Sequence, residues 1–473
     1  MNMNTRIYLG IILLFCFSCS KKWDDHIGKT EAASNKTLYE VMGDKPEFAS
    51  FFSLVNKSGY GEDLKSSKNF TVLVPTNEAI ESVKALYDFN DTTVVRSFVG
   101  YHILNAVYDV NESSDTIRVR NLRNKYVELT HGAFDGVVAQ QKNNVAGNGL
   151  YHVIGTPLKP LQNIYTLVNT LYAETEQIST LFKYDSSFFA AWYNEVKRPL
   201  TTESSKYTFF VVDDAYFNQE YDQMKPFYYT HYTDDIADST SKYYTSKALM
   251  RDFIVPGDIN IDAATTELTS LSNTKLTVNK DDIISRVKTS NGTVYRVSKL
   301  DYTLSDRIKE IKILGSKPSG YKQNDKRGNT FFRTKRDTLG NIYEDIEIYD
   351  HKVTSFYAKF RAANANTVKY KVYGRAISGL PGDPQTAAFI QYVYYFNPLA
   401  VSANEPDLYK KSVINNTGAA DTRMTFSVAP LFHDEVYLGE YTQDEFGYLP
   451  LLVMSNGTGP IILEYLRFVP QLP

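Results

Sequence analysis

The chain has 473 residues, a formal net charge of −3 and a hydrophobic fraction of 43%, with 36 tyrosines, 27 phenylalanines and 2 cysteines. This length allows about three domains, and the hydrophobic fraction is sufficient for ordinary globular cores. Because the chain has no broad basic field to attract phosphate backbones, its composition argues against nucleic-acid binding.

The first residues form an apolar run that is too short to cross a bilayer. Residues 7–17 would span about 16 Å as a helix, whereas the hydrocarbon core is about 30 Å thick. A run of this length is typical of a secretory signal, and it ends here at Ser18-Cys19. The segment resembles a bacterial lipoprotein signal peptide, residues 1–18, which implies cleavage before Cys19 and acylation of that cysteine. An ordinary cleaved signal or a retained anchor is the alternative.

The cysteine count agrees with such an anchor. Cys16 and Cys19 are the only cysteines, so the processed chain would keep one and could form no internal disulfide. Residues 19–33 are then a tether. Its acidic start, Trp23-Asp24-Asp25, resembles export signals of Bacteroidetes-type lipoproteins, and a plain linker explains it equally well. We therefore expect a lipid-anchored protein of the outer membrane, exposed at the cell surface.

Three sequence blocks occur twice in the same order. They are residues 70–80 and 207–217, 94–104 and 249–259, and 147–154 and 290–297. The first block is a buried-type β run followed by polar residues suited to cap a helix. The third contains Asn-Gly before a β-branched run, which predicts a hairpin. The order of the blocks predicts a tandem duplication.

The first copy of these blocks resembles the fasciclin (FAS1) domain. The resemblance lies in residues 70–80, the Tyr101-His102 pair, and Asn148-Gly149 running into His152, and it covers residues 34–162. The second copy, residues 163–301, has diverged: Pro256-Gly257 replaces the Tyr-His pair, and Tyr295 or Arg296 replaces the histidine. The resemblance implies two tandem fasciclin-like α+β domains, and it implies adhesion or extracellular recognition in place of catalysis.

Residues 302–473 have a different pattern. Short strands recur between polar turns, which is typical of an antiparallel β-sandwich (jelly roll); we expect them at residues 353–360, 368–373, 388–396, 423–428, 435–441, 451–455 and 461–468. The last of these resemble the final strands of galactose-binding-like domains. Residues 315–337 carry seven Lys or Arg against two Asp, which favours a solvated loop over an anion site.

The sequence offers no catalytic or cofactor motif. No HExxH, GxSxG, P-loop or dinucleotide pattern occurs, and no two histidines lie at helical metal-ligand spacing. His102 and His152 are expected to be structural. We therefore expect no cofactor, no metal and no enzyme activity; a hydrolase that uses carboxylates of the sandwich is the weaker alternative.

Two aromatic segments are candidate binding sites. On a strand at 388–396, Tyr392, Tyr394 and Phe396 share one face, and Val393 and Tyr395 share the other. An exposed face would form a platform for a sugar ring, and a face turned toward the opposite sheet would be core. The second segment is an apparent loop insertion that contains Tyr228, Tyr229 and Tyr232, where partner contact and local packing remain equally open.

These expectations combine into a non-enzymatic surface lipoprotein for binding or adhesion. The leading hypothesis is an accessory subunit that binds a glycan or peptide and associates with an outer-membrane nutrient transporter. The alternative is an adhesion or assembly scaffold that binds only other proteins.

Overall fold

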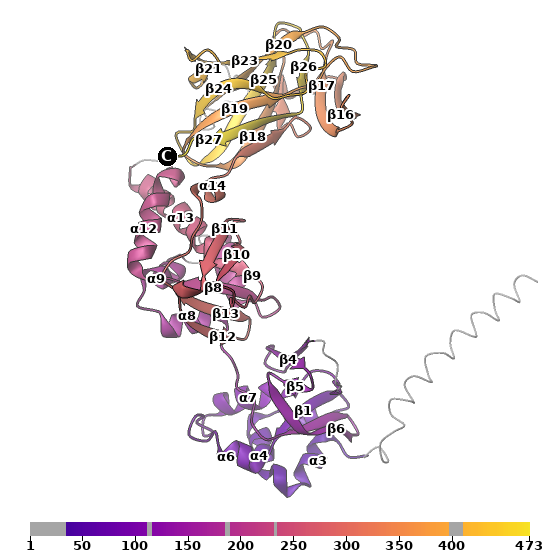
Figure 1. The fold of residues 1–473 in the computed structure, drawn as a ribbon. Coiled ribbons are helices and arrows are strands. Elements are labelled where there is room, and N and C mark those ends of the chain that lie inside the picture. The colour runs from indigo at the N-terminus through magenta and orange to yellow at the C-terminus, as the bar shows by residue number, and fades with distance from the viewer. Residues whose placement is uncertain (1–34, 111–115, 185–189, 231–233, 397–409) are drawn as a thin grey trace, which may run out of the picture. The chain divides into compact units, whose positions relative to one another are not determined.

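The computed structural model describes residues 35–110, 116–184, 190–230, 234–396 and 410–473 (Figure 1). The chain divides into two compact units. Among the described residues, the first unit lies within 35–167 with the short segments 201–206 and 288–291, and the second lies within 168–200, 207–287 and 292–473.

The first copy of the repeat is an α+β domain. Its helices are α3 (Leu38–Gly43), η1 (Pro46–Phe48), α4 (Ala49–Ser58), α5 (Gly61–Lys65), α6 (Asn77–Glu81) and α7 (Thr92–Tyr101). Its strands are β1 (Phe70–Pro75), β2 (Ile103–Leu104), β3 (Ile117–Arg120), β4 (Tyr126–Thr130), β5 (Ala133–Phe134), β6 (Val137–Ala146) and β7 (Gly149–Ile154). They form one sheet in the order β2-β1-β7-β6-β5-β4-β3.

Strand β1 organises the interior of this copy. All six of its residues are buried. Because side chains alternate across a strand, Val72 and Val74 pack with helices α3, α4 and α7 on one side, and Leu73 packs with strands β3 and β4 on the other. The strand ends where Thr76 caps α6, its side chain accepting a hydrogen bond from the Ala79 amide at 3.2 Å. The predicted strand and helix cap are confirmed.

The second copy contains the same kinds of element. Its helices are α8 (Ile164–Leu171), α9 (Glu176–Lys183), α10 (Ala190–Trp192), η2 (Tyr193–Lys197), α11 (Arg198–Thr201), α12 (Asp214–Met224), η3 (Lys225–Tyr228), α13 (Asp234–Asp252) and η4 (Lys280–Asp282). Its strands are β8 (Tyr207–Val211), β9 (Ile254–Pro256), β10 (Thr265–Thr269), β11 (Lys275–Asn279), β12 (Ile283–Thr289) and β13 (Gly292–Val297). The sheets are β12-β13-β8-β9 and β10-β11.

The two copies share one strand pairing. Strand β1 runs parallel to β7 with Phe70 opposite Gly149, and β8 runs parallel to β13 with Tyr207 opposite Gly292. Both glycines have positive φ, +145° and +142°, and a Cβ on either would overlap the carbonyl oxygen of the residue opposite. The side chain of the asparagine before each glycine accepts a hydrogen bond from the start of a helix: Asn148 accepts the Leu38 amide of α3 at 2.7 Å. Asn291 does the same for Ile164 of α8 at 2.8 Å.

One predicted equivalence between the copies is wrong. The amide of Leu73 donates to the His102 carbonyl at 2.9 Å, and the amide of Phe210 donates to the Phe253 carbonyl at the same distance. Asp252 and Phe253 therefore occupy the place of Tyr101 and His102, and Pro256-Gly257 lies further along the chain. An ungapped match of the sequence blocks pairs Tyr101 with Pro256, whereas helix α13 ends at Asp252 as helix α7 ends at Tyr101.

Strand pairing identifies which residue of the second copy corresponds to His152. Leu73 faces His152 and Phe210 faces Tyr295 in the two parallel pairs. The Tyr295 hydroxyl donates to the Ile259 carbonyl at 3.0 Å, as His152 Nε2 contacts the Tyr108 carbonyl at 3.1 Å. Of the two residues that the sequence left open, Tyr295 takes the place of the histidine.

Helix α14 (Leu304–Arg307) lies between the second copy and the C-terminal strands in the chain. The Arg307 side chain is 1% exposed and is paired with Glu220 and with Asp252, the latter at 2.9 Å. Its guanidinium lies 3.4 Å from the ring centroid of Tyr302. One cation thus lies between two carboxylates inside the second unit.

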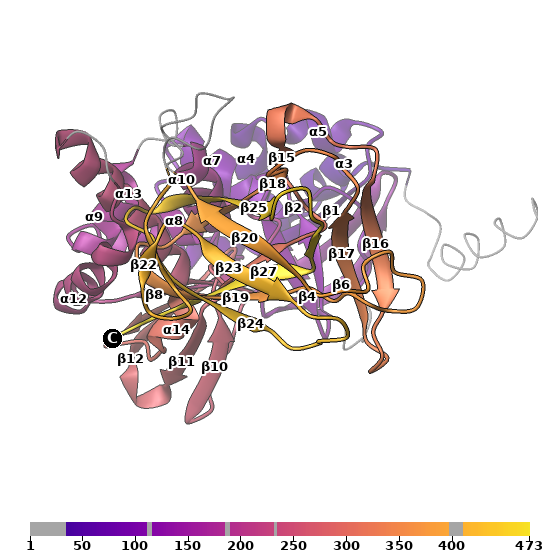
Figure 2. The same ribbon diagram turned by 90° about the horizontal axis from the view of Figure 1, so that it is seen from above.

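The C-terminal region is an antiparallel β-sandwich. Its strands are β14 (Ile311–Leu314), β15 (Gly320–Tyr321), β16 (Thr330–Arg336), β17 (Ile342–Ile348), β18 (Tyr357–Ala365), β19 (Lys369–Arg375), β20 (Phe389–Tyr395), β21 (Val413–Asn415), β22 (Ala420–Asp421), β23 (Met424–Val428), β24 (Val436–Thr442), β25 (Gly447–Ser455), β26 (Ile461–Leu463) and β27 (Tyr465–Pro470), with η5 (Lys322–Asn324). They form sheets β14-β27-β19-β24-β21-β22, β15-β18-β25-β20-β23 and β16-β17-β26. Figure 2 shows β20 and β23 side by side, as their pairing requires.

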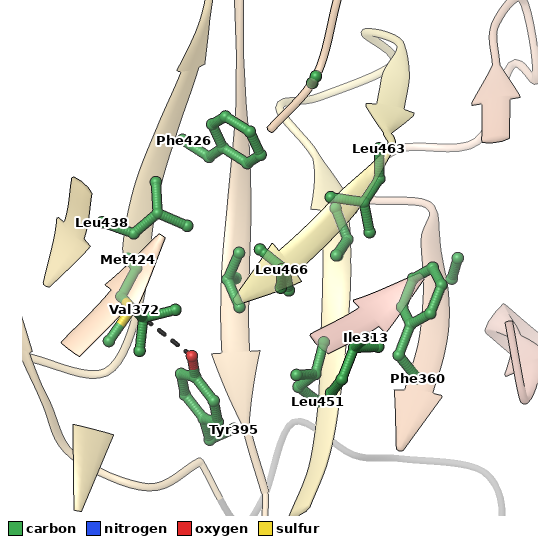
Figure 3. Close-up of a cluster of buried hydrophobic side chains, with 14 of the residues drawn as sticks. Ile313, Phe360, Val372, Tyr395, Met424, Phe426, Leu438, Leu451, Leu463 and Leu466 are labelled. Carbon is green, nitrogen blue, oxygen red and sulfur yellow. Dashed lines mark hydrogen bonds between the residues drawn. The ribbon is translucent and has the colours of Figure 1, made fainter. Parts of the chain in front are cut away.

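The sheets enclose one apolar core. Val372, Leu438 and Leu466 of the six-stranded sheet meet Phe360, Leu451 and other residues of the five-stranded sheet (Figure 3). The Tyr395 hydroxyl, fully buried among them, donates to the Met424 sulfur at 3.6 Å (Figure 3). The fold class that the sequence predicts, two fasciclin-like α+β domains and an antiparallel sandwich, is confirmed.

Two local expectations are wrong. Part of the basic segment 315–337 is strand β16, whose Arg333 and Lys335 form ion pairs with buried carboxylates and so are not solvated. The tyrosine-rich insertion is helical in η3 and α13, in place of a loop. In both cases tertiary partners, which local composition does not reveal, decide the structure.

Candidate functional site

The outer face of the five-stranded sheet carries the first candidate segment. Along β20, Val393 and Tyr395 point into the sandwich core, whereas Tyr394 belongs to a separate cluster against which Tyr392 and Phe396 pack. The predicted alternation is therefore present, and Tyr392, Tyr394 and Phe396 lie on the side away from the core.

Strand register places further side chains on this face. Residues directly opposite each other in an antiparallel pair point to the same side. Tyr392 faces Met454 of β25, which in turn faces Tyr357 of β18, and Tyr394 faces Leu452. The rings of Tyr392 and Tyr394 are 6.4 Å apart between centroids. The face is thus a continuous apolar and aromatic surface across three strands.

The exposure of this surface is uneven. Tyr394 is 7% exposed and Leu452 is 1% exposed, so the centre is closed to solvent. Tyr392 and Phe396 are half-buried. Contact with a ligand would therefore use the accessible parts of Tyr392 and Phe396, with Tyr394 supporting them from within.

Cationic side chains lie across the rings. The Arg423 guanidinium is 4.4 Å from the ring centroid of Tyr392, and Lys410 Nζ is 4.5 Å from that of Tyr394. A hydrogen bond with the Tyr394 side chain raises the pKa of Arg423. Such contacts are favourable because the face of an aromatic ring attracts cations.

The second candidate segment takes part in packing inside the second unit. Tyr228 is 9% exposed, its ring centroid lies 4.9 Å from that of Phe446, and burial raises its pKa to about 12. The Tyr229 carbonyl accepts a hydrogen bond from the Phe446 amide at 2.5 Å, while its side chain is 45% exposed. Burial in this contact removes Tyr228 as a residue for an outside partner. Tyr232 lies outside the described residues.

His102 and His152 of the first copy are structural. The fully buried His102 accepts the Leu158 amide on Nε2 at 2.9 Å, so its Nδ1 carries the proton and donates to the Phe98 carbonyl at 2.8 Å. Desolvation lowers the pKa of His102 to about 4. Burial also lowers the pKa of His152, whose ring nitrogens contact the Asn143 amide and the Tyr108 carbonyl. Both rings are neutral hydrogen-bonding groups.

Buried carboxylates of the sandwich form ion pairs with a cationic side chain. Arg333 contacts Asp345 at 2.5 Å, Glu347 at 2.5 Å and Asp383 at 3.2 Å. Burial raises the pKa of Asp345 and of Glu347, and Arg333 opposes that rise. These acids are at most 3% exposed in their side chains, so they form an internal ion-pair network that substrate would not reach.

Other expected features lie beyond these groups. Cys19 and the proposed signal are outside the described residues. Among the residues that are described, no helix is long and apolar enough to span a membrane. That same part of the chain contains no group of three His, Cys, Asp or Glu side chains able to hold a metal ion.

The sequence missed the residues that surround the three rings. Tyr357, Arg423 and Lys410 lie near Tyr392 and Tyr394 only because distant segments pair in the sheet. Alternation within residues 353–360 and 423–428 could have placed Tyr357 and Arg423 on one face of their own strands. It could not have shown which strands are neighbours.

Comparison with known proteins identifies one part of the chain. Residues 46–160 match the model of the fasciclin domain. No curated protein matches the chain.

Several solved structures are similar to this chain at low identity. The FAS1 domain pair of the insect cell adhesion molecule fasciclin I is 13% identical and covers 56% of this chain and 99% of its own, with a TM-score of 0.24. A family 35 carbohydrate-binding module from Clostridium thermocellum is 13% identical and covers 34% and 99%, with a TM-score of 0.21. CBM35 from Cellvibrio japonicus Abf62 is 9% identical and covers 35% and 95%, with a TM-score of 0.22. The family match, together with the described fold, shows that residues 46–160 of this chain form a fasciclin domain.

Proposed function

We propose that this chain is a lipid-anchored surface protein that binds a glycan on the outer face of the five-stranded sheet and catalyses no reaction. The supporting observation is the row of outward rings on β20, Tyr392, Tyr394 and Phe396, which continues into the apolar side chains of β25. The accessible parts of Tyr392 and Phe396 are available for recognition, whereas Tyr394 and the rings of the core are not.

The geometry suits a sugar for a physical reason. Aromatic side chains combine a large apolar face with, in tyrosine, a polar tip that forms hydrogen bonds. The C–H face of a pyranose can pack on such a ring while its hydroxyls meet the tyrosine hydroxyl and nearby polar groups. The half-buried Tyr392 and Phe396 leave part of each ring for this contact.

Calorimetric titration of the full chain with soluble polysaccharides tests the site. We expect Tyr392→Ala and Phe396→Ala each to weaken glycan binding by about 2- to 12-fold, the equivalent of 0.5–1.5 kcal/mol for an aromatic contact. Tyr437→Ala is the matched control, because Tyr437 is a 36% exposed tyrosine of β24 in the other sheet. Equal effects of all three substitutions would refute the site, and release of cleavage products would refute the absence of catalysis.

The anchor and its location are part of the proposal. Acylation at Cys19 would hold the protein at the outer membrane, exposed at the cell surface, where it would deliver glycan to a nutrient transporter. Cys19→Ala should move the protein to the soluble fraction. Purification of the native protein in detergent should recover a transporter in stoichiometric amount, and its absence would remove that partner from the proposal.

A second candidate function is an adhesion scaffold that binds only other proteins. The fasciclin domain at residues 46–160 favours it, because domains of that family act in adhesion. Two results together would favour the scaffold: the chain binds no glycan in calorimetry, and purification in detergent recovers a protein partner in stoichiometric amount.

A further inference from the structure

The five-stranded sheet contains no acidic residue. None of its strands, β15, β18, β20, β23 and β25, contains Asp or Glu. Lys359 and Arg361 of β18 lie opposite Leu452 and Pro450 of β25, on the side that Tyr394 also occupies. Together with Arg423 and Lys410 over the rings, they place four cationic side chains on one face.

Three of these cations have no carboxylate within ion-pair distance in the part of the chain that the structure describes: Lys359, Arg361 and Arg423. Arg361 and Arg423 are also exposed, and Lys359 is partly exposed. Like charges gathered on one face add to a field that attracts anionic ligands.

The other face of the sandwich behaves differently. Arg467 of the six-stranded sheet contacts Glu435 at 2.5 Å and Glu310 at 3.1 Å. In the same sheet Lys369 pairs with Glu440, and Arg375 pairs with Glu464. The positive charge of the five-stranded face is therefore a local feature, in a chain whose net charge is −3.

From this contrast we infer that the ligand of the five-stranded face is an acidic glycan, whose sugars carry carboxylate or sulfate groups. The inference rests on the proposed function and names the ligand class of the same site. The accessible parts of the rings of Tyr392 and Phe396 receive the sugar faces, and the surrounding cations receive the anionic groups. Arg361 and Arg423 can bind a carboxylate or sulfate through two parallel hydrogen bonds, which makes such contacts strong and directional.

Matched polysaccharides that differ only in charge test the ligand class. Binding of the full chain is measured by calorimetry to polygalacturonate and to its methyl ester, and to dextran sulfate and to dextran. We expect the charged member of at least one pair to bind and its neutral counterpart to bind at least tenfold more weakly. Binding should also weaken when NaCl rises from about 50 to about 500 mM, because salt screens exposed charges.

Charge substitutions locate the interaction. Lys359→Gln combined with Arg361→Gln should weaken binding of the acidic glycan roughly 2- to 25-fold, since each exposed charge contact is worth about 0.2–1 kcal/mol. Lys371→Gln on β19, in the six-stranded sheet, should have no effect. Both changes affect surface side chains, so circular dichroism should report an unaltered fold.

The outcomes separate the inference from the function on which it rests. Equal binding of charged and neutral glycans would overturn the acidic-glycan inference and leave the glycan-binding function standing. Binding of no glycan at all would overturn both. Equally tight binding of polyglutamate or DNA of matched charge would show that charge alone is recognised, and so would overturn the assignment to a glycan.

Discussion

The side chain of Asn148 offers the sharpest test of how the first copy is held together. It is 4% exposed and forms three hydrogen bonds: it accepts the Leu38 amide at 2.7 Å, and it donates to the Leu64 carbonyl at 2.9 Å and the Ser66 carbonyl at 2.7 Å. It thereby joins the hairpin before β7 to the start of α3 and to the end of α5. Asn148→Ala would break all three links and leave the Leu38 amide without its partner.

The expected cost follows from these bonds. A hydrogen bond contributes about 1 kcal/mol net, and a buried donor left unsatisfied costs about 1–3 kcal/mol. We therefore expect Asn148→Ala to lower the free energy of unfolding of the first copy by roughly 3 kcal/mol, which is about a 100-fold change in the unfolding constant.

Urea titration followed by hydrogen–deuterium exchange of peptides from residues 35–160 measures this copy separately from the rest of the chain. Asn144→Ala is the control, because Asn144 is half-buried and its amide donates one hydrogen bond, to the Tyr151 carbonyl at 3.2 Å. A loss for Asn148→Ala no larger than that for Asn144→Ala would refute the reasoning.

The remaining predictions concern buried charge and protonation. Arg333→Ala should destabilise the sandwich by about 3–5 kcal/mol because it leaves buried carboxylates unpaired. Arg327→Ala is the control: it removes a surface ion pair with Asp325 and should destabilise the sandwich by less than about 1 kcal/mol. Hydrogen exchange of peptides from residues 330–348 in urea measures the stability of both variants. Burial lowers the pKa of His102 from 6.5 to about 4, so the unfolded chain binds more protons between these values. The free energy of unfolding of the first copy should therefore fall by up to roughly 3 kcal/mol as the pH falls from 6.5 to 4. His102→Gln should reduce this loss. A free energy of unfolding in urea that does not change over this pH range would contradict the prediction.

Local patterns predicted much of the fold. The buried run at β1, followed by Thr76 as a helix cap, has its counterpart at β8, where Asp213 caps α12 by accepting the Tyr216 amide at 2.9 Å. The Asn-Gly pairs correctly marked the ends of two hairpins. In these places the information lies within a few consecutive residues, because caps, tight turns and alternation are local properties of the backbone.

The candidate site was predictable only in part. Alternation placed Tyr392 and Tyr394 on one face, but whether that face was inside or outside depends on the second sheet. Lys359 and Arg423 join the site through strand pairing between distant segments, which no local pattern encodes. The ion pairs of Arg333 were not predictable for the same reason, since its partners Asp345 and Asp383 lie 12 and 50 residues further along the chain.

Arg307 has a practical consequence for dissecting the protein. It lies six residues after residue 301, where the sequence places the end of the second copy, yet it forms ion pairs with Glu220 and Asp252 inside that copy. A fragment that stops at residue 301 would keep two buried acids without their cation, and removing one member of a buried ion pair costs about 3–5 kcal/mol. Expression of the second copy alone therefore requires a stop codon placed beyond Arg307.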